Sequence, residues 1–248
     1  MPPFQVRVGA QSVTGEYRDR NEDRYWVDLE RALCLVADGM GGQSAGEQAS
    51  GMAVEIIPRE LRPTLDSGTE DPERVIGGIR RAIVATNREI MALSHLDRQY
   101  QNMGTTVVLA LVRGANVYLA GIGDSRAYLI RGRTIKQYTV DHSVAEALVE
   151  AGTISRQQAR GHPFRNMLCK YLGSKDVGDS PEVSVVSARS GDRFLLASDG
   201  LTNVVDDAQI RDTVRKQADP QRCADRLVEM AIDADTHDNV TCVLVYLG

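Results

Sequence analysis

Several features that mark common functional classes are missing from this 248-residue sequence. No apolar run approaches the roughly 20 residues that cross a bilayer, and residues 1–7 lack the apolar centre of a signal peptide. Basic residues number 29 against 34 acidic ones, for a net charge of −5, whereas a nucleic-acid-binding domain usually carries a basic excess. These absences predict a cytoplasmic protein with no membrane or nucleic-acid partner.

Closely spaced cysteines are also missing. The four cysteines, Cys34, Cys169, Cys223 and Cys242, form no CxxC pair, so neither a zinc site nor a disulfide framework is expected, and we predict buried free thiols. The sequence contains no internal repeat, low-complexity tract or linker. With 42% hydrophobic and 25% charged residues, the composition is that of a globular protein, and we predict a single domain over residues 1–248.

Short apolar segments predict strands. They cover residues 33–37, 105–112, 117–122, 194–197 and 240–246. Because these runs are not interrupted by polar residues, we expect strands that are covered on both faces. Gly132 lies between residues 127–130 and 134–135 and predicts a hairpin turn there.

Helical signals separate these strands. Ser44 and Glu47 predict a capping box before a helical stripe, and Asp71-Pro72 and Asp219-Pro220 each predict the start of a further helix. The elements do not alternate regularly as in a doubly wound parallel sheet. The order therefore favours an α+β fold built on an antiparallel β-sandwich.

Four aspartates stand next to the predicted strands. Asp38 and Asp199 follow buried strands and precede glycine, Asp124 lies just past another strand, and Asp238 comes just before the last one. Carboxylates gathered at one edge of a sandwich repel one another and require a cation, and oxygen ligands prefer Mg²⁺, Mn²⁺ or Ca²⁺. The alternative is that each aspartate only stabilises a turn. The shared position at four strands favours the metal site.

The segment 18–23 adds an arginine and two further carboxylates. Arg18 can grip a phosphoryl group with two parallel hydrogen bonds, and Glu22 and Asp23 are candidate metal ligands. Taken alone, the segment is weak evidence for a site, because charged turns are common, and a solvated loop is the favoured interpretation.

The ordered set of motifs resembles the PPM, or PP2C-like, family of metal-dependent protein phosphatases, in its bacterial form. The resemblance spans residues 8–246 and rests on these motifs: Arg18 with Asn21-Glu22-Asp23, Asp38-Gly39-Met40-Gly41-Gly42, Ala45-Gly46-Glu47, Gly104-Thr105-Thr106, Gly123-Asp124-Ser125-Arg126, Asp141-His142-Ser143, Ser198-Asp199-Gly200 and Asp238-Asn239-Val240-Thr241. It implies a central antiparallel β-sandwich flanked by α-helical layers (α-β-β-α), with a small flap at about residues 142–180.

The resemblance also implies a role for each candidate residue. Asp38 would bridge two Mn²⁺ or Mg²⁺ ions, Asp199 and Asp238 would complete the first site, and the Gly39 carbonyl would join the second. Glu22 or Asp23 would reach the second ion directly or through water, and Asp124 with Asp199 would hold a third ion. Arg18 would bind the substrate phosphate, and the activated water would release serine or threonine without a covalent intermediate.

Two positions depart from the family pattern. Met40 stands where eukaryotic members carry a histidine proposed as general acid, and Asn203 replaces an aspartate that some relatives use for the third ion. His142 and His162 are expected to be structural or surface residues rather than acids. In the flap, Arg165, Asn166 and Lys170 are candidate contacts to a phosphopeptide.

Three other functions fit parts of the pattern. A pseudophosphatase that only binds phosphoproteins is disfavoured because Asp38, Asp199 and Asp238 are all present. A phosphatase for small molecules stays open, and a stress-signalling phosphatase acting on anti-sigma-factor antagonists is disfavoured by the intact 18–23 segment. We expect a monomer that dephosphorylates phosphoproteins, including a serine/threonine kinase.

Overall fold

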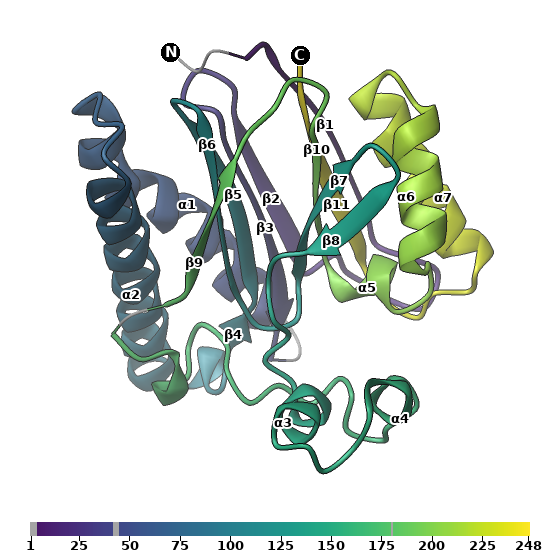
Figure 1. The fold of residues 1–248 in the computed structure, drawn as a ribbon. Helices are drawn as coiled ribbons and strands as arrows, with labels where there is room; N and C mark the ends of the chain where they lie inside the picture. Colours follow the sequence, from purple (N-terminus) through teal and green to yellow (C-terminus); the bar gives the residue numbers. More distant parts are fainter. Residues whose placement is uncertain (1–3, 42–44, 180) are drawn as a thin grey trace.

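The computed structural model describes residues 4–41, 45–179 and 181–248, which form two antiparallel β-sheets with helices on their outer faces (Figure 1). One sheet has the order β1-β11-β10-β7-β8 and the other the order β2-β3-β5-β6-β9, and β4 pairs with the end of β3. The strands are β1 (Val6–Val13), β2 (Asp23–Asp28), β3 (Leu33–Met40), β4 (Gly104–Thr105), β5 (Val107–Arg113), β6 (Asn116–Ile122), β7 (Arg126–Arg131), β8 (Thr134–Gln137), β9 (Val183–Ser187), β10 (Arg193–Ala197) and β11 (Val240–Leu247).

Each sheet is covered on both faces, which explains the uninterrupted apolar runs. Along β3, Leu33 and Leu35 pack against the helices, whereas Cys34 and Val36 point into the space between the sheets. The helices on this side are α1 (Ala45–Asp66) and α2 (Pro72–Leu96). The helices α5 (Asp199–Thr202), α6 (Asp207–Lys216) and α7 (Pro220–Asp233) cover the other sheet. The predicted α-β-β-α sandwich is confirmed.

The predicted helix starts can be compared with the structure one by one. Asp71 caps α2 by accepting a hydrogen bond from the backbone of Glu73, and Asp219 caps α7 in the same way through the backbone of Arg222. Both predictions are confirmed. The capping box assigned to Ser44 lies outside the described residues, and α1 begins at Ala45.

Two sequence predictions need correction. The run 105–112 is not one strand, because it is interrupted at Thr106, whose backbone N–H donates to the Asp38 carbonyl oxygen at 2.8 Å. The cysteines are free, as predicted, but only Cys34, Cys223 and Cys242 are buried, while Cys169 is exposed. Within the described residues, no helix is both long and apolar enough to span a membrane.

The segment between β8 and β9 projects from one end of the sandwich (Figure 1). It carries two short helices, α3 (Val144–Glu150) and α4 (Arg156–Arg160), each capped by a serine, together with the 3₁₀ turn η2 (Lys175–Val177). A second 3₁₀ turn, η1 (Arg98–Tyr100), follows α2. The projecting segment lies at the end of the molecule where β3 meets β4, so it stands beside the predicted acidic site.

Candidate metal and phosphate site

Strand pairing brings the predicted acidic residues together. Asp23 begins β2 and lies directly opposite Asp38 in the β2–β3 pair. In the other sheet, β10 and β11 run antiparallel, so Asp199, which follows the end of β10, and Asp238, which precedes β11, lie at the same end. Asp124 follows β6, at the turn into β7. The site therefore lies where the two sheets meet at one end of the sandwich.

Two threonines fix the backbone of Asp38. The Thr106 hydroxyl accepts a hydrogen bond from the Asp38 backbone N–H at 3.0 Å, and the Thr105 hydroxyl donates to the Asp38 carbonyl at 2.9 Å. Thr106 is buried and also shares a 2.6 Å hydrogen bond with the buried Ser125 hydroxyl, next to Asp124. The backbone polar groups of Asp38 are thus bonded within the protein, which leaves its carboxylate for another partner.

Burial and mutual repulsion make the ionised carboxylates costly. Burial, reinforced by the charge of Asp199, raises the pKa of Asp23 to about 7 and that of Asp124 to about 8. Burial and the charge of Asp238 raise the pKa of Asp199 to about 6. The pKa of Asp38 lies well above its usual range, first because of burial and then because of the surrounding aspartates. A divalent cation would offset all of these penalties together.

The buried oxygen atoms of the site fit such a cation. Glu22 Oε1, Asp23 Oδ1 and Asp199 Oδ1 are buried and have no hydrogen-bond partner among the described residues. Within the same residues, no three Asp, Glu, His or Cys side chains are arranged so that they alone would hold one ion. Mg²⁺ is commonly bound through one or two carboxylates with water in its remaining positions. The donor set fits hard cations that keep part of their water shell.

Two glycines allow the chain to pass close to the carboxylates. A Cβ at Gly39 would overlap the Gly46 carbonyl at the start of α1, and one at Gly200 would overlap the Asn239 carbonyl beside Asp238. Neither position has room for a side chain, so the Asp-Gly pairs follow from packing at the site.

Arg18 lies at the rim of the acidic cluster. Its Nη2 forms a 2.7 Å ion pair with Asp238 Oδ2, and its Nε donates to the His237 carbonyl at 3.2 Å. The Arg18 side chain is 44% exposed, so a ligand can reach the guanidinium from solvent. Burial raises the pKa of Glu22 above its usual value, and the positive charge of Arg18 offsets part of this rise.

A buried asparagine joins the segment of Arg18 to that of Asp238. The Asn239 Nδ2 donates to the carbonyls of Thr14 and Arg20, at 2.6 and 2.9 Å, and its Oδ1 accepts from the Glu22 backbone N–H at 2.8 Å. One amide therefore fixes the loop before β2 against the strand that follows Asp238, more than 200 residues later in the sequence.

This arrangement of strands and acidic residues agrees with a family comparison. The family model described as protein phosphatase 2C matches residues 17–231. The chain belongs to the protein phosphatase 2C family. The match covers β2 to α7, with Asp23, Asp38, Asp124, Asp199 and the projecting segment of this phosphatase, and the resemblance inferred from the motifs is confirmed.

Relatives match over nearly the whole chain. Protein phosphatase PhpP of Streptococcus pneumoniae is 36% identical over 247 residues, which cover 98% of both chains. The solved serine/threonine phosphatase PstP/Ppp of Mycobacterium tuberculosis is 34% identical, with a TM-score of 0.88 and 98% of both chains covered. A structure of the PstP catalytic domain in complex with two manganese ions is 32% identical, with a TM-score of 0.82, and the comparison covers 98% of this chain and 99% of that one.

The departures from the family pattern have clear local consequences. Asn203 donates from Nδ2 to Asp199 Oδ2 at 2.9 Å, so it occupies one oxygen of a predicted ligand of the third ion. Met40 ends β3 and pairs with Gly104 of β4. Neither side chain is an ionisable acid, so this phosphatase has no proton donor at either position.

The two flap histidines take structural positions. His142 Nδ1 accepts from the Gly123 backbone N–H at 3.0 Å, and burial lowers its pKa to about 4, so the ring is neutral at pH 7. It supports the turn that carries Asp124. His162 Nδ1 accepts from the backbone of Phe164 at 3.2 Å. The geometry agrees with the predicted structural roles.

A cavity of about 460 Å³ adjoins the acidic site. Its lining includes Asp124 and Asp199 on the sandwich side and Arg156, Arg160 and Arg165 from the flap. Arg156 is paired with Glu146 at 3.0 Å. Of the predicted flap contacts Arg165, Asn166 and Lys170, only Arg165 lines this cavity.

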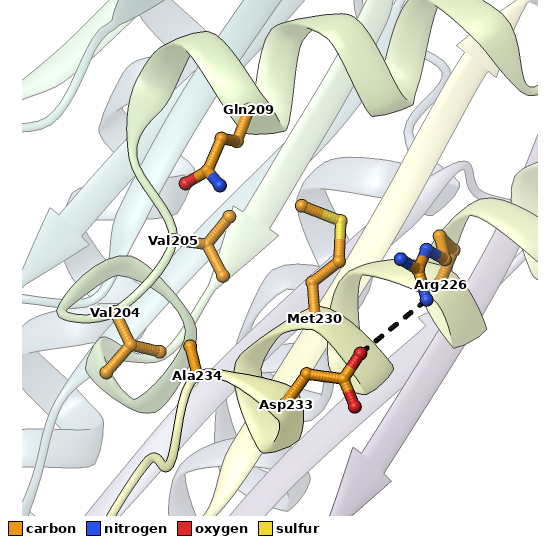
Figure 2. A pocket seen from close by; sticks show the side chains of 7 residues that line it. All are labelled: Val204, Val205, Gln209, Arg226, Met230, Asp233 and Ala234. Carbon is orange, nitrogen blue, oxygen red and sulfur yellow. Dashed lines mark ion pairs between the residues drawn. The ribbon is translucent and has the colours of Figure 1, made fainter.

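A second cavity of about 280 Å³ lies apart from the acidic residues. Figure 2 shows Val204, Val205 and Gln209 on one side and side chains of α7 on the other, with an Arg226–Asp233 ion pair of 3.9 Å at its edge. None of the predicted metal ligands lines it, so it contributes nothing to the site chemistry.

Sequence reasoning missed the residues that support the ligands. The Ser198 hydroxyl donates to Asp23 Oδ2 at 2.8 Å, and Thr106 and Asn239 hold the backbone near Asp38 and Asp238. All three lie inside motifs that were recognised. No spacing rule reveals their partners, because each contact joins segments that are distant in sequence.

Proposed function

We propose that the acidic cluster is the catalytic centre of this serine/threonine protein phosphatase and that it holds Mn²⁺ or Mg²⁺. The observation that carries the proposal is the convergence of Asp23, Asp38, Asp124 and Asp199, whose pKa values are all raised. The manganese ions of the related PstP structure support the choice of metal.

The ligand assignment follows the predicted roles. Asp38 with Asp199 and Asp238 would hold one ion, and Asp38 with the Gly39 carbonyl a second. Glu22 or Asp23 would contact the second ion directly or through water, and the Ser198 hydroxyl orients Asp23. Asp124 with Asp199 would hold a third ion, which Asn203 weakens because it already donates to Asp199.

When bound, the ions supply an activated water for attack on phosphorus and positive charge beside the phosphoryl oxygens. Arg18 binds and orients the phosphate through its fork of N–H donors, since its guanidinium is accessible at the rim. One Arg18 N–H already bonds to Asp238 and another to the His237 carbonyl, and the guanidinium has further N–H groups that can donate to the phosphate. Met40 provides no acid, and solvent would protonate the serine or threonine leaving group.

The substrate is proposed to be phosphoserine or phosphothreonine in proteins, including a serine/threonine kinase that the enzyme opposes. The names of its relatives as serine/threonine phosphatases support protein substrates, and the cavity beside the flap provides room for a few residues of a polypeptide. A single-domain monomer with its flap at about residues 142–180, and cytoplasmic localisation, stay predictions.

Turnover of a phosphothreonine peptide and of p-nitrophenyl phosphate should be measured with Mn²⁺, with Mg²⁺ and with EDTA. We expect metal-dependent hydrolysis that is lost in Asp38→Ala and retained in Asp66→Ala, whose exposed carboxylate pairs with Arg31 away from the acidic site. Hydrolysis that persists in EDTA, or in Asp38→Ala with metal, would refute the proposed centre. Hydrolysis of p-nitrophenyl phosphate without any hydrolysis of the peptide would point to small-molecule substrates.

A further inference from the structure

Tyr17, the residue before Arg18 in the sequence, forms an exposed aromatic pair with His237. The rings of Tyr17 and His237 are stacked, with 4.0 Å between their centroids and 16° between their planes. The Tyr17 hydroxyl donates to Asp235 Oδ1 at 2.7 Å. Tyr17 is 55% exposed, and among the described residues its hydrogen bond and its stacked aromatic partner both lie in the 235–237 loop. The proposed mechanism gives none of these three residues a role.

The stacking with His237 and the hydrogen bond to Asp235 hold the 235–237 loop, and the His237 carbonyl of this loop positions Arg18. Arg18 Nε donates to the His237 carbonyl at 3.2 Å, and its other side-chain contact is the ion pair with Asp238. If Asp238 binds a metal ion in place of Arg18, the His237 carbonyl is the remaining contact among the described residues that orients the guanidinium. Long arginine side chains lose much rotamer entropy when they are fixed, so this contact affects phosphate affinity.

Asp238 does not depend on the aromatic pair. Its Oδ1 accepts from the Asn239 backbone N–H at 2.8 Å, and the Asn239 amide is bound to Thr14, Arg20 and Glu22. Gly15 also packs tightly against the Asp238 carbonyl. The proposed metal ligand is therefore held by contacts that involve neither Tyr17 nor the His237 ring.

We infer that Tyr17, with His237 and Asp235, is a positioning residue for Arg18 and that it controls phosphate binding without controlling metal binding. The inference rests on the proposed role of Arg18. Asp235 adopts a positive φ of 58°, a conformation that ordinary residues rarely take, and the Tyr17 hydroxyl holds its side chain there. The loop is thus held in one conformation beside Arg18.

The test compares Tyr17→Ala, Tyr17→Phe, Arg18→Ala and the double variant, with Tyr25→Ala as a matched control. Tyr25 is 42% exposed on β2 and contacts neither loop through any hydrogen bond or aromatic pair found in the described residues. For each variant we would measure KM and kcat with p-nitrophenyl phosphate, the affinity for inorganic phosphate, and Mn²⁺ affinity by calorimetry.

For Tyr17→Ala we expect KM and the phosphate dissociation constant to rise about threefold to tenfold, as for partial loss of a charge-assisted hydrogen bond. The kcat and the Mn²⁺ affinity should stay within about twofold of wild type. A higher KM at unchanged kcat is expected when the substrate and the transition state lose the same binding energy. Tyr17→Phe keeps the stacked ring and loses the bond to Asp235, so its KM should lie between those of wild type and Tyr17→Ala. Tyr25→Ala should match wild type.

The double variant decides whether Tyr17 acts through Arg18. In the Arg18→Ala background, Tyr17→Ala should leave KM unchanged, because the two effects are not independent. An equal rise of KM in both backgrounds, a parallel loss of Mn²⁺ affinity, or an unchanged KM in Tyr17→Ala would overturn the inference. If Arg18→Ala itself leaves KM and phosphate affinity unchanged, the proposed role of Arg18 fails, and the inference fails with it.

Discussion

The side chain of Asn239 offers the sharpest test of how this active site is assembled. It is 4% exposed and makes three hydrogen bonds, two as donor to Thr14 and Arg20 and one as acceptor from Glu22. Asn239→Ala removes all three. Each such bond contributes about 1 kcal/mol net, and a buried polar group left without a partner costs more, so we expect a loss of about 3 kcal/mol in unfolding free energy.

Urea denaturation in EDTA measures this loss directly, without stabilisation by bound metal. For a chain of this size, a loss of about 3 kcal/mol corresponds to a fall in Tm of about 6 to 12 °C. Asn239→Asp keeps the acceptor for the Glu22 N–H but loses both donor bonds and adds a charge beside Asp238, so it should also be destabilised. With Mn²⁺, kcat/KM of Asn239→Ala should fall, because the loop that carries Arg18 is no longer fixed against Asp238.

The matched control is Asn203→Ala. Asn203 is exposed, and its side chain makes one hydrogen bond within the part of the chain that the structure describes, to Asp199, so its removal should cost less than about 1 kcal/mol. The reasoning fails if Asn239→Ala is destabilised by no more than Asn203→Ala. It fails equally if Asn239→Ala is destabilised while kcat/KM in Mn²⁺ is unchanged, since the amide would then support the fold but not the site.

Three further predictions follow from the same contacts. The pKa is raised from 3.8 to about 6 for Asp199 and to about 8 for Asp124. Through these two groups the folded chain holds more protons than the unfolded chain between about pH 4 and 8. In EDTA the unfolding free energy should therefore fall as pH rises through this window, and saturating Mn²⁺ should abolish or reverse that slope in urea titrations at several pH values. Asn203→Asp replaces a donor with a carboxylate beside Asp199, so calorimetry should show an additional or tighter Mn²⁺ site, whereas unchanged Mn²⁺ binding would contradict the assignment of a third site there. Thr106→Val leaves the buried Asp38 N–H without its acceptor and should cost about 1 to 3 kcal/mol together with reduced kcat, and an unchanged kcat would show that Thr106 does not position Asp38.

Several helix starts, the buried strands and the family were predicted from local sequence patterns. Asp-Pro pairs predicted the starts of α2 and α7, because an aspartate cap and a proline in the first turn act within a few residues. Uninterrupted apolar runs predicted strands covered on both faces, which the three separate hydrophobic layers confirm. The order of Asp-Gly motifs after such strands indicated the family.

Other elements gave weaker local signals. The strands β1 and β2 were not predicted, and Asp23, which the sequence placed in a charged segment, is a buried strand residue opposite Asp38. The interruption at Thr106 was also missed, because a threonine inside an apolar run is compatible with a continuous strand.

The sequence by itself determined that Asp38, Asp124, Asp199 and Asp238 border strands and that α2 and α7 begin at Asp-Pro pairs, since these depend on near neighbours in the chain. Only the tertiary structure decided how the residues meet. Antiparallel pairing set Asp23 opposite Asp38, Ser198 reached Asp23 across 175 residues, and Asn239 tied the Arg18 segment to the final strand. The raised pKa values exist only in this assembled state, because burial and the repulsion between carboxylates require that distant segments share one water-poor space.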